Sequence, residues 1–131
     1  MDAQIVFRRL SIKPGECIIV KGKVLPKAES FSLNLYHNDS DIIFHFNPRF
    51  EINTIVCNSR KNGQWELEQR ESVFPFKQGE DTKISLSFDS KEVTLKIKGG
   101  QEVKFPNRFG VDSAKIFSVE GDFAITSVEF D

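Results

Sequence analysis

The stretch from Phe44 to Phe50, Phe-His-Phe-Asn-Pro-Arg-Phe, decides the fold because aromatic and polar side chains alternate along it. Successive side chains of a β-strand point to opposite faces of its sheet. A strand here sends its phenylalanines to one face and lays His45, Asn47 and Arg49 in a row on the other. The pattern therefore predicts a strand between an aromatic core and a polar surface.

The polar row is also the clearest functional signal in the sequence. A strand that needed only solubility would carry Lys, Thr or Glu at these positions. His45, Asn47 and Arg49 instead offer an imidazole, an amide and a guanidinium fork, which together can donate and accept hydrogen bonds. Such a set is suited to reading the positions of hydroxyl groups on a neutral polar ligand.

Short alternating segments separated by turn residues recur along the whole chain, while helical periodicity is scarce. Gly99-Gly100 is typical of a tight hairpin turn. The expected strands span 6–10, 17–24, 31–35, 41–50, 54–58, 64–76, 83–88, 93–97, 102–105, 115–119 and 123–130. Ten to twelve short strands at this spacing predict an all-β fold, a sandwich or a barrel, and the many phenylalanines suit the core of a sandwich.

The bulk composition bounds the class of protein. A length of 131 residues suits one domain, 1–131, with a real core. Eighteen basic against 19 acidic residues give a net charge of −1, which argues against a nucleic-acid partner. No apolar run approaches the length of a membrane span, and no leader sequence is visible. Membrane insertion is therefore not expected.

The two cysteines, Cys17 and Cys57, lie in apolar strand-like runs. The simplest interpretation is two buried free thiols, because a buried cysteine behaves as a small hydrophobe. A disulfide is the alternative, and the absence of a visible leader sequence argues against it. Neither cysteine forms a recognised metal-ligand spacing with His37 or His45. We therefore expect no metal site and no cofactor.

A second group of polar and aromatic residues follows downstream: Asn58, Trp65, Glu68 and Arg70. Trp65, the only tryptophan, follows a turn, where its ring can form a stacking platform. Glu68 is placed to hold Arg70 and Arg49 through charge-assisted hydrogen bonds. Trp65 and Glu68 differ in parity, so both can face one ligand only if the strand is bulged or broken within 65–68.

Taken together, these residues resemble the carbohydrate-recognition signature of the galectins. The matching signature reads His45-x-Asn47-Pro48-Arg49, then Val56-x-Asn58, then Trp65-x-x-Glu68-x-Arg70. Further matching segments are Lys13-Pro14-Gly15, Val73-Phe74-Pro75-Phe76, Phe105-Pro106-Asn107-Arg108 and Gly121-Asp122-Phe123. The resemblance covers the whole chain and is closest to the prototype members, which have a single domain.

The resemblance implies a two-sheet antiparallel, jelly-roll-like β-sandwich that binds β-galactosides on its concave sheet. The resemblance implies that the axial 4-hydroxyl of galactose is contacted by His45, Asn47 and Arg49, and the 6-hydroxyl by Asn58 and Glu68. It implies that Trp65 stacks on the galactose ring. It also implies that the neighbouring sugar is contacted by Arg49, Glu68 and Arg70. A site built around the axial hydroxyl would reject glucose, whose 4-hydroxyl is equatorial and would leave polar groups unpaired.

Two positions depart from the family pattern. Glu66 follows the tryptophan, where family members usually carry a small residue such as glycine, so we expect it to alter the rim of the site. The stretch 51–53 is shorter than the corresponding loop of many members, in which an acidic residue supports the arginines. Glu51 is the candidate substitute for that residue. Both changes bear more on the preference for extended glycans than on galactose binding.

Three functions are to be weighed against the sequence. A non-catalytic lectin is the first. A glycosidase is the second, but hydrolysis usually needs two carboxyl groups, whereas the site offers Glu68 between two arginines, a poor setting for a raised pKa. A galectin-like protein that has altered or lost its sugar specificity and acts through protein contacts is the third, and the intact signature argues against it.

The resemblance also implies partners and location. Prototype members form two-fold dimers through their terminal strands, which crosslink glycoproteins or glycolipids. The candidate edges here are 4–10 and 123–130, with Val6, Ile125 and Val128 as apolar contacts. Free thiols suit the cytoplasm, and galectins also reach the cell exterior by a non-classical route, so both locations are expected.

Overall fold

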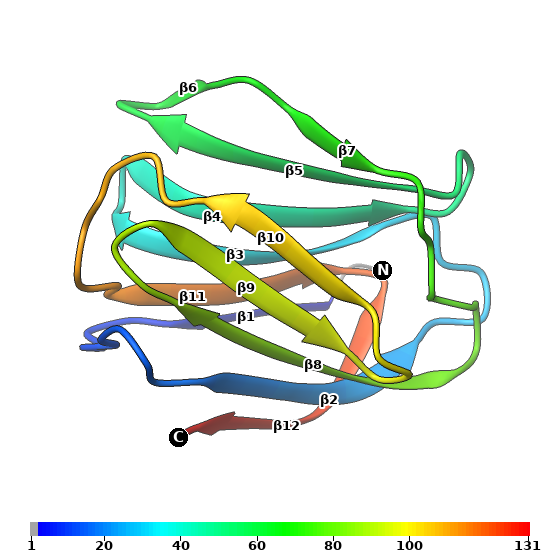
Figure 1. The fold of residues 1–131 in the computed structure, drawn as a ribbon. Coiled ribbons are helices and arrows are strands. Elements are labelled where there is room, and N and C mark those ends of the chain that lie inside the picture. Colours follow the sequence, from blue (N-terminus) through cyan, green and yellow to red (C-terminus); the bar gives the residue numbers. More distant parts are fainter. Residues whose placement is uncertain (1–2) are drawn as a thin grey trace.

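The computed structural model describes residues 3–131, whose strands form two antiparallel sheets packed face to face (Figure 1). The order of the first sheet is β1 (Ala3–Phe7), β11 (Ile116–Gly121), β3 (Phe31–Asn38), β4 (Asp41–Arg49) and β5 (Thr54–Lys61), and β5 then pairs with both β6 (Gln64–Trp65) and β7 (Gln69–Glu71). The order of the second is β10 (Glu102–Pro106), β9 (Glu92–Ile97), β8 (Asp81–Phe88), β2 (Ile18–Val24) and β12 (Phe123–Phe130). Residues 3–131 contain no helix that could span a bilayer.

Aromatic side chains from both sheets fill the space between them. Phe44 and Phe46 of β4 are almost completely buried, as the alternation predicts. The ring of Phe44 lies 5.2 Å from that of Phe105 on the opposite sheet, and Phe31 stacks on Phe123 at 4.9 Å between centroids. Because β4 is anchored through these rings, its polar row is held on the outer face of the first sheet.

The expected all-β sandwich is confirmed, and Gly99-Gly100 does connect β9 to β10. The strand expected over 64–76 is wrong: the chain forms only the short β6 and β7 there, and 72–76 is irregular. Along 72–76 the core anchor is Phe76, which packs edge-on against Phe31 at 5.3 Å, so aromatic packing replaces ladder pairing.

The first strand and the turn after β5 also differ from expectation. The strand expected over 6–10 runs from Ala3 to Phe7, and Arg9 has a φ of 61°, a left-handed conformation that does not continue a strand. β5 extends to Lys61, and the turn is reduced to Asn62 and Gly63, with φ of 52° and 79°. Two positive φ values in succession are the geometry of a tight hairpin.

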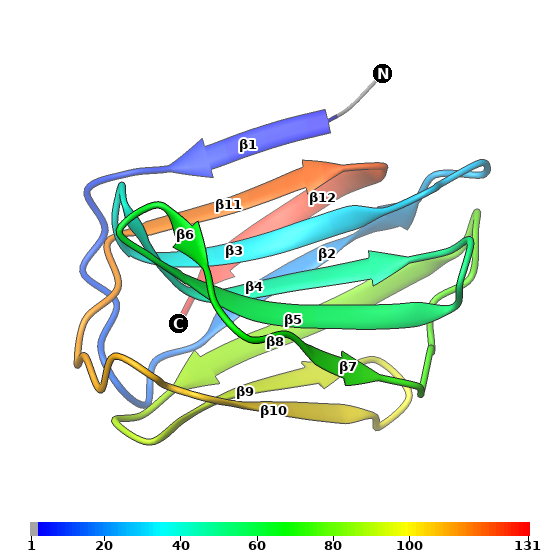
Figure 2. The same ribbon diagram turned by 90° about the horizontal axis from the view of Figure 1, so that it is seen from above.

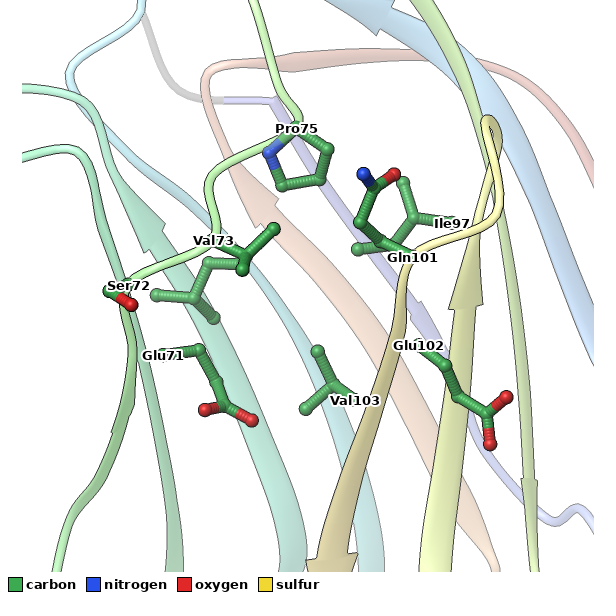
Figure 3. A pocket seen from close by; sticks show the side chains of 9 residues that line it. Glu71, Ser72, Val73, Pro75, Ile97, Gln101, Glu102 and Val103 are labelled. Carbon is green, nitrogen blue, oxygen red and sulfur yellow. The ribbon is translucent and has the colours of Figure 1, made fainter.

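The strands near the two chain ends lie at sheet edges, as the dimer hypothesis requires. β1 ends the first sheet and β12 ends the second (Figure 2). Ile5, Val6 and Phe130 are partly exposed there, while Ile125 and Val128 pack against the core.

The interpretation of two buried thiols is right for Cys57 and wrong for Cys17. Burial, with a smaller contribution from Glu71, raises the pKa of the Cys57 thiol to about 12, which keeps it protonated. Cys17 precedes β2 and is only half-buried. Neither forms a disulfide, and the described part of the chain contains no cluster of acidic, His or Cys side chains placed to hold a metal.

Candidate functional site

The register of β4 against β5 brings the two groups of predicted residues together. His45 lies opposite Asn58, and Asn47 lies opposite Val56, whose other neighbour is Arg70 on β7. Paired residues in antiparallel strands point to the same face. The polar row of β4 therefore continues across β5 to the edge strands.

A groove of about 480 Å³ opens on this face of the first sheet. Five of the seven predicted residues line it, together with Val56 and Glu66: His45, Arg49, Asn58, Trp65 and Glu68. Asn47 and Arg70 do not line it and flank it in the sheet. Its size suits a group as large as one or two sugar rings.

The strand is broken where the parity argument requires it. β6 ends at Trp65 and β7 begins at Gln69, so 66–68 forms an irregular link (Figure 2). This break confirms the predicted irregularity and allows Trp65 and Glu68 to line the same groove. Trp65 is 49% exposed, and its ring centroid lies 4.7 Å from that of His45.

The neutral ring of His45 is held in one tautomer by Asn34, a buried residue on β3. The Asn34 amide nitrogen donates to Ser32, Ser118 and Glu120, so its oxygen faces the imidazole and accepts from Nδ1–H at 2.5 Å. The Nε2 atom of the neutral ring is then an acceptor. Burial, and after it the charge of Arg49, lowers the pKa of His45 to about 4.

Arg49 and Asn47 form a coupled pair. The Asn47 amide donates to the Phe31 carbonyl at 2.8 Å, and its oxygen accepts from Arg49 Nε at 2.9 Å. This arrangement orients the guanidinium along the groove and leaves its outer N–H groups to donate to a ligand.

The expectation that Glu68 bridges both arginines is half wrong. Glu68 pairs with Arg70 at 3.1 Å, but in residues 3–131 no ion pair joins it to Arg49, which uses Asn47 instead. Glu51 does not support the arginine either: it lies in a different hollow, beside Phe50 and Lys77. Glu51, in the short loop 51–53, is not among the residues that line the groove.

Glu66, the departure from the family pattern, does lie at the rim beside Trp65. Its carboxylate accepts from the Ser59 hydroxyl at 2.8 Å, and its backbone N–H bonds to the Ser59 carbonyl at 3.0 Å. The carbonyl of Glu66 accepts from the Asn58 amide at 3.1 Å. The acid is therefore tied to β5 and adds a fixed negative charge to the groove.

Sequence reasoning missed Asn34 and Arg108, which hold site residues in place. Asn34 contacts His45, and Arg108 donates to Asn58, Ser59 and Leu67. Asn34 lies on the polar side of an alternating segment, which was a usable signal, but its partner depends on register. Arg108 comes from a distant loop, and nothing in the local pattern indicates its target.

Comparison with known proteins agrees with this geometry. The family model described as galactoside-binding lectin matches residues 5–130. Galectin-1 from sheep (Ovis aries) is 45% identical over 135 residues, covering 100% of each chain. CG-16, a homodimeric agglutinin from chicken liver, has a TM-score of 0.95 at 42% identity, covering 98% of this chain and 100% of that one.

A toad ovary galectin, solved in complex with thio-digalactose, has a TM-score of 0.93 at 33% identity and covers 98% of both chains. These likenesses run the length of the fold and include the strands that carry the groove. The chain belongs to the galactoside-binding lectin family, the galectins, and is similar to its prototype members.

Proposed function

We propose that this protein is a non-catalytic lectin whose single carbohydrate-recognition domain, 1–131, binds β-galactosides in the groove described above. The observation that carries the proposal is that the imidazole of His45 and the indole of Trp65 open onto one groove. Family membership and the complex of the toad ovary galectin with thio-digalactose support the same ligand class.

The chemistry of the groove suits galactose. Neutral His45 accepts through Nε2 while Arg49 donates, so one hydroxyl placed between them can make both hydrogen bonds. We assign the axial 4-hydroxyl to this position, with Asn47 setting the guanidinium. The apolar C–H face of the sugar would stack on Trp65, and Asn58 with Glu68 would hold the 6-hydroxyl. Arg49, Glu68 and Arg70 would reach the second sugar.

The test is a titration with lactose followed by the fluorescence of Trp65, the only tryptophan. A disaccharide has about two dozen heavy atoms, and roughly −0.3 kcal/mol per atom bounds the Kd at about 10 μM. We expect saturable binding of lactose at or above this value and none of maltose, which lacks the axial hydroxyl. An equal fluorescence response to both sugars, or no response to either, would contradict the proposal.

The pH dependence of lactose binding follows from the His45 pKa of about 4. The protonated ring loses its Nε2 acceptor, so affinity falls as pH drops through this pKa. Between pH 8 and pH 5 we expect the Kd to stay within about twofold, whereas a histidine at the ordinary pKa of ~6.5 would raise it ~30-fold at pH 5. Calorimetric titration at pH 8, 6.5 and 5 decides between these outcomes, with circular dichroism as the control for folding.

We further propose a homodimer through the edge strands β1 and β12, which gives two sugar sites for crosslinking glycoconjugates. The exposed apolar side chains of Ile5, Val6 and Phe130 support this assignment, as does the homodimeric state of the chicken agglutinin. Sedimentation at tens of micromolar should give twice the monomer mass, and a purely monomeric profile would reject the dimer.

We infer that the protein acts in the cytoplasm and, after non-classical secretion, at the cell exterior, where the glycan ligands of galectins lie. The support is its family membership. Detection of the protein in culture medium, with secretion unaffected by a block of the classical pathway, would test the inference. Strict retention in intact cells would contradict it.

A further inference from the structure

Arg108 reaches from the second sheet to the groove on the first. It lies in the connection after β10, its guanidinium 4.7 Å from the ring centroid of Phe105. Its Nη1 donates to Ser59 Oγ at 2.9 Å and to Asn58 Oδ1 at 3.3 Å, and its Nη2 donates to the Leu67 carbonyl at 2.7 Å. Both terminal nitrogens of the guanidinium therefore donate hydrogen bonds on the same side of the groove.

One of the three acceptors, the Leu67 carbonyl, belongs to a part of the site that the sheet does not fix, whereas Asn58 and Ser59 lie on β5. The link 66–68 lies outside the strand ladder, and the Leu67 side chain is 80% exposed, so no apolar packing anchors it. Trp65 and Glu68, which both line the groove, lie at either side of this carbonyl. A guanidinium bond to the backbone here limits how far the link can move.

The same guanidinium sets the orientation of the Asn58 amide. Asn58 Oδ1 accepts from Arg108 and from the Ser59 backbone N–H at 2.8 Å, which places the NH₂ group on the opposite side. One N–H then donates to the Glu66 carbonyl, and the other is free to donate into the groove. If the amide rotated, the groove would gain an acceptor in place of this donor.

The loop that carries Arg108 is itself rigidly held. Asn107 is buried, and its amide donates to the carbonyls of Asp89 and Val111 at 2.9 and 3.0 Å, while its oxygen accepts from the Gly110 N–H at 3.1 Å. Arg108 thus extends from a fixed point of the second sheet, and its contacts can impose a position on the link.

We propose that Arg108 is a positioning residue for galactoside binding, which fixes the Asn58 amide and the 66–68 link and so builds the side of the groove that receives the galactose 6-hydroxyl. The inference rests on the proposed function. Loss of Arg108 should weaken recognition of the 6-hydroxyl, while recognition of the 4-hydroxyl by His45 and Arg49 persists.

The experiment compares Arg108→Met with the unmodified protein on two sugars, lactose and lactose that lacks the galactose 6-hydroxyl. Methionine keeps much of the apolar stem without its donors. We expect the Kd for lactose to rise about five- to tenfold, as for the loss of a charged hydrogen bond, and the Kd for the 6-deoxy sugar to rise less than twofold. An equal rise for both sugars, or no rise, would overturn the proposal.

Arg8→Met is the matched control, because Arg8 is exposed, its ion pair within residues 3–131 is with Asp39, and neither residue lines the groove. Arg108→Lys keeps the charge but not the two-ended fork, so it should recover only part of the loss. It also replaces the methionine variant if that variant does not fold.

Hydrogen exchange of the sugar-free proteins gives a readout that does not depend on lectin activity. In Arg108→Met the amides of 66–68 should exchange faster, while those of β4 remain unchanged. Unchanged hydrogen exchange of the amides of 66–68 would refute the positioning role of Arg108, even if lactose binds. Absence of lactose binding by the unmodified protein would instead refute the proposed function, and the exchange result would still decide whether Arg108 holds the link.

Discussion

Trp65→Ala should raise the Kd for lactose on the order of 30-fold or more, the largest effect expected from a single substitution here. Trp65 is about half exposed and lines the groove. If a sugar covers ~80 Å² of its indole, burial contributes about 2 kcal/mol at ~25 cal/mol per Å². Stacking adds about 0.5–1.5 kcal/mol by analogy with aromatic pairs. Calorimetry is the measurement, because the substitution removes the only fluorescent indole.

Trp65→Phe is the matched variant, since it keeps an aromatic face and should keep most of the affinity. Both variants should fold normally, because Trp65 is a surface residue on the two-residue strand β6 and contributes nothing to the core. Thermal unfolding checks this point. An alanine variant that binds lactose like the unmodified protein would exclude Trp65 from the site.

Local alternation sufficed to predict most of the sandwich. The strand Asp41–Arg49 and the hairpin at Gly99-Gly100 depend on side-chain period and turn chemistry, which are properties of neighbouring residues. The continuous strand expected over 64–76 failed because apolar residues there also fit an irregular segment. Phe76 meets the core by packing on Phe31 rather than by pairing in a ladder.

Five of the seven residues that the sequence predicts for the candidate site line the groove, whereas the hydrogen bonds between site residues were harder to predict. Parity alone placed His45 and Arg49 on one face and required the break before Glu68. The partner of each group depends on cross-strand register and side-chain reach, which sequence spacing does not contain. Arg49 therefore bonds Asn47 rather than Glu68, and Arg108 arrives from a loop some 50 residues beyond Asn58.

The pKa and the tautomer of His45 also depend on residues that sequence spacing does not identify. Its low pKa comes from burial first and Arg49 second, and its tautomer comes from Asn34 on the neighbouring strand. None of these can be assigned until β3 and β4 are in register. The residue types that contact a ligand leave a signature in sequence, whereas the residues that hold them in place are distributed over the fold.

Arg49→Ala should raise the Kd for lactose at least tenfold, which corresponds to about 1.4 kcal/mol for a lost charged contact. The substitution removes the donors that the groove offers beside His45, and it also leaves Asn47 Oδ1 without the Nε–H that it accepts. Asn47 can then reorient, so one change disturbs two residues of the candidate site. Calorimetric titration with lactose measures the effect.

Arg49→Lys and Arg70→Ala separate charge from geometry. Lysine restores the charge but cannot donate to Asn47 and to a ligand from one planar fork, so its affinity should fall between those of alanine and arginine. Arg70 is 50% exposed and already paired with Glu68, an exposed ion pair of little energetic value, so Arg70→Ala should weaken binding less than Arg49→Ala.

Arg49 has a second, independent signature in the pH profile. Because its charge helps to lower the pKa of His45, Arg49→Ala should move that pKa upward from about 4, and lactose binding should begin to weaken at a higher pH than in the unmodified protein. A tenfold loss with an unshifted pH profile would mean that Arg49 contacts the sugar without acting on the imidazole. An unchanged Kd would remove Arg49 from the site altogether.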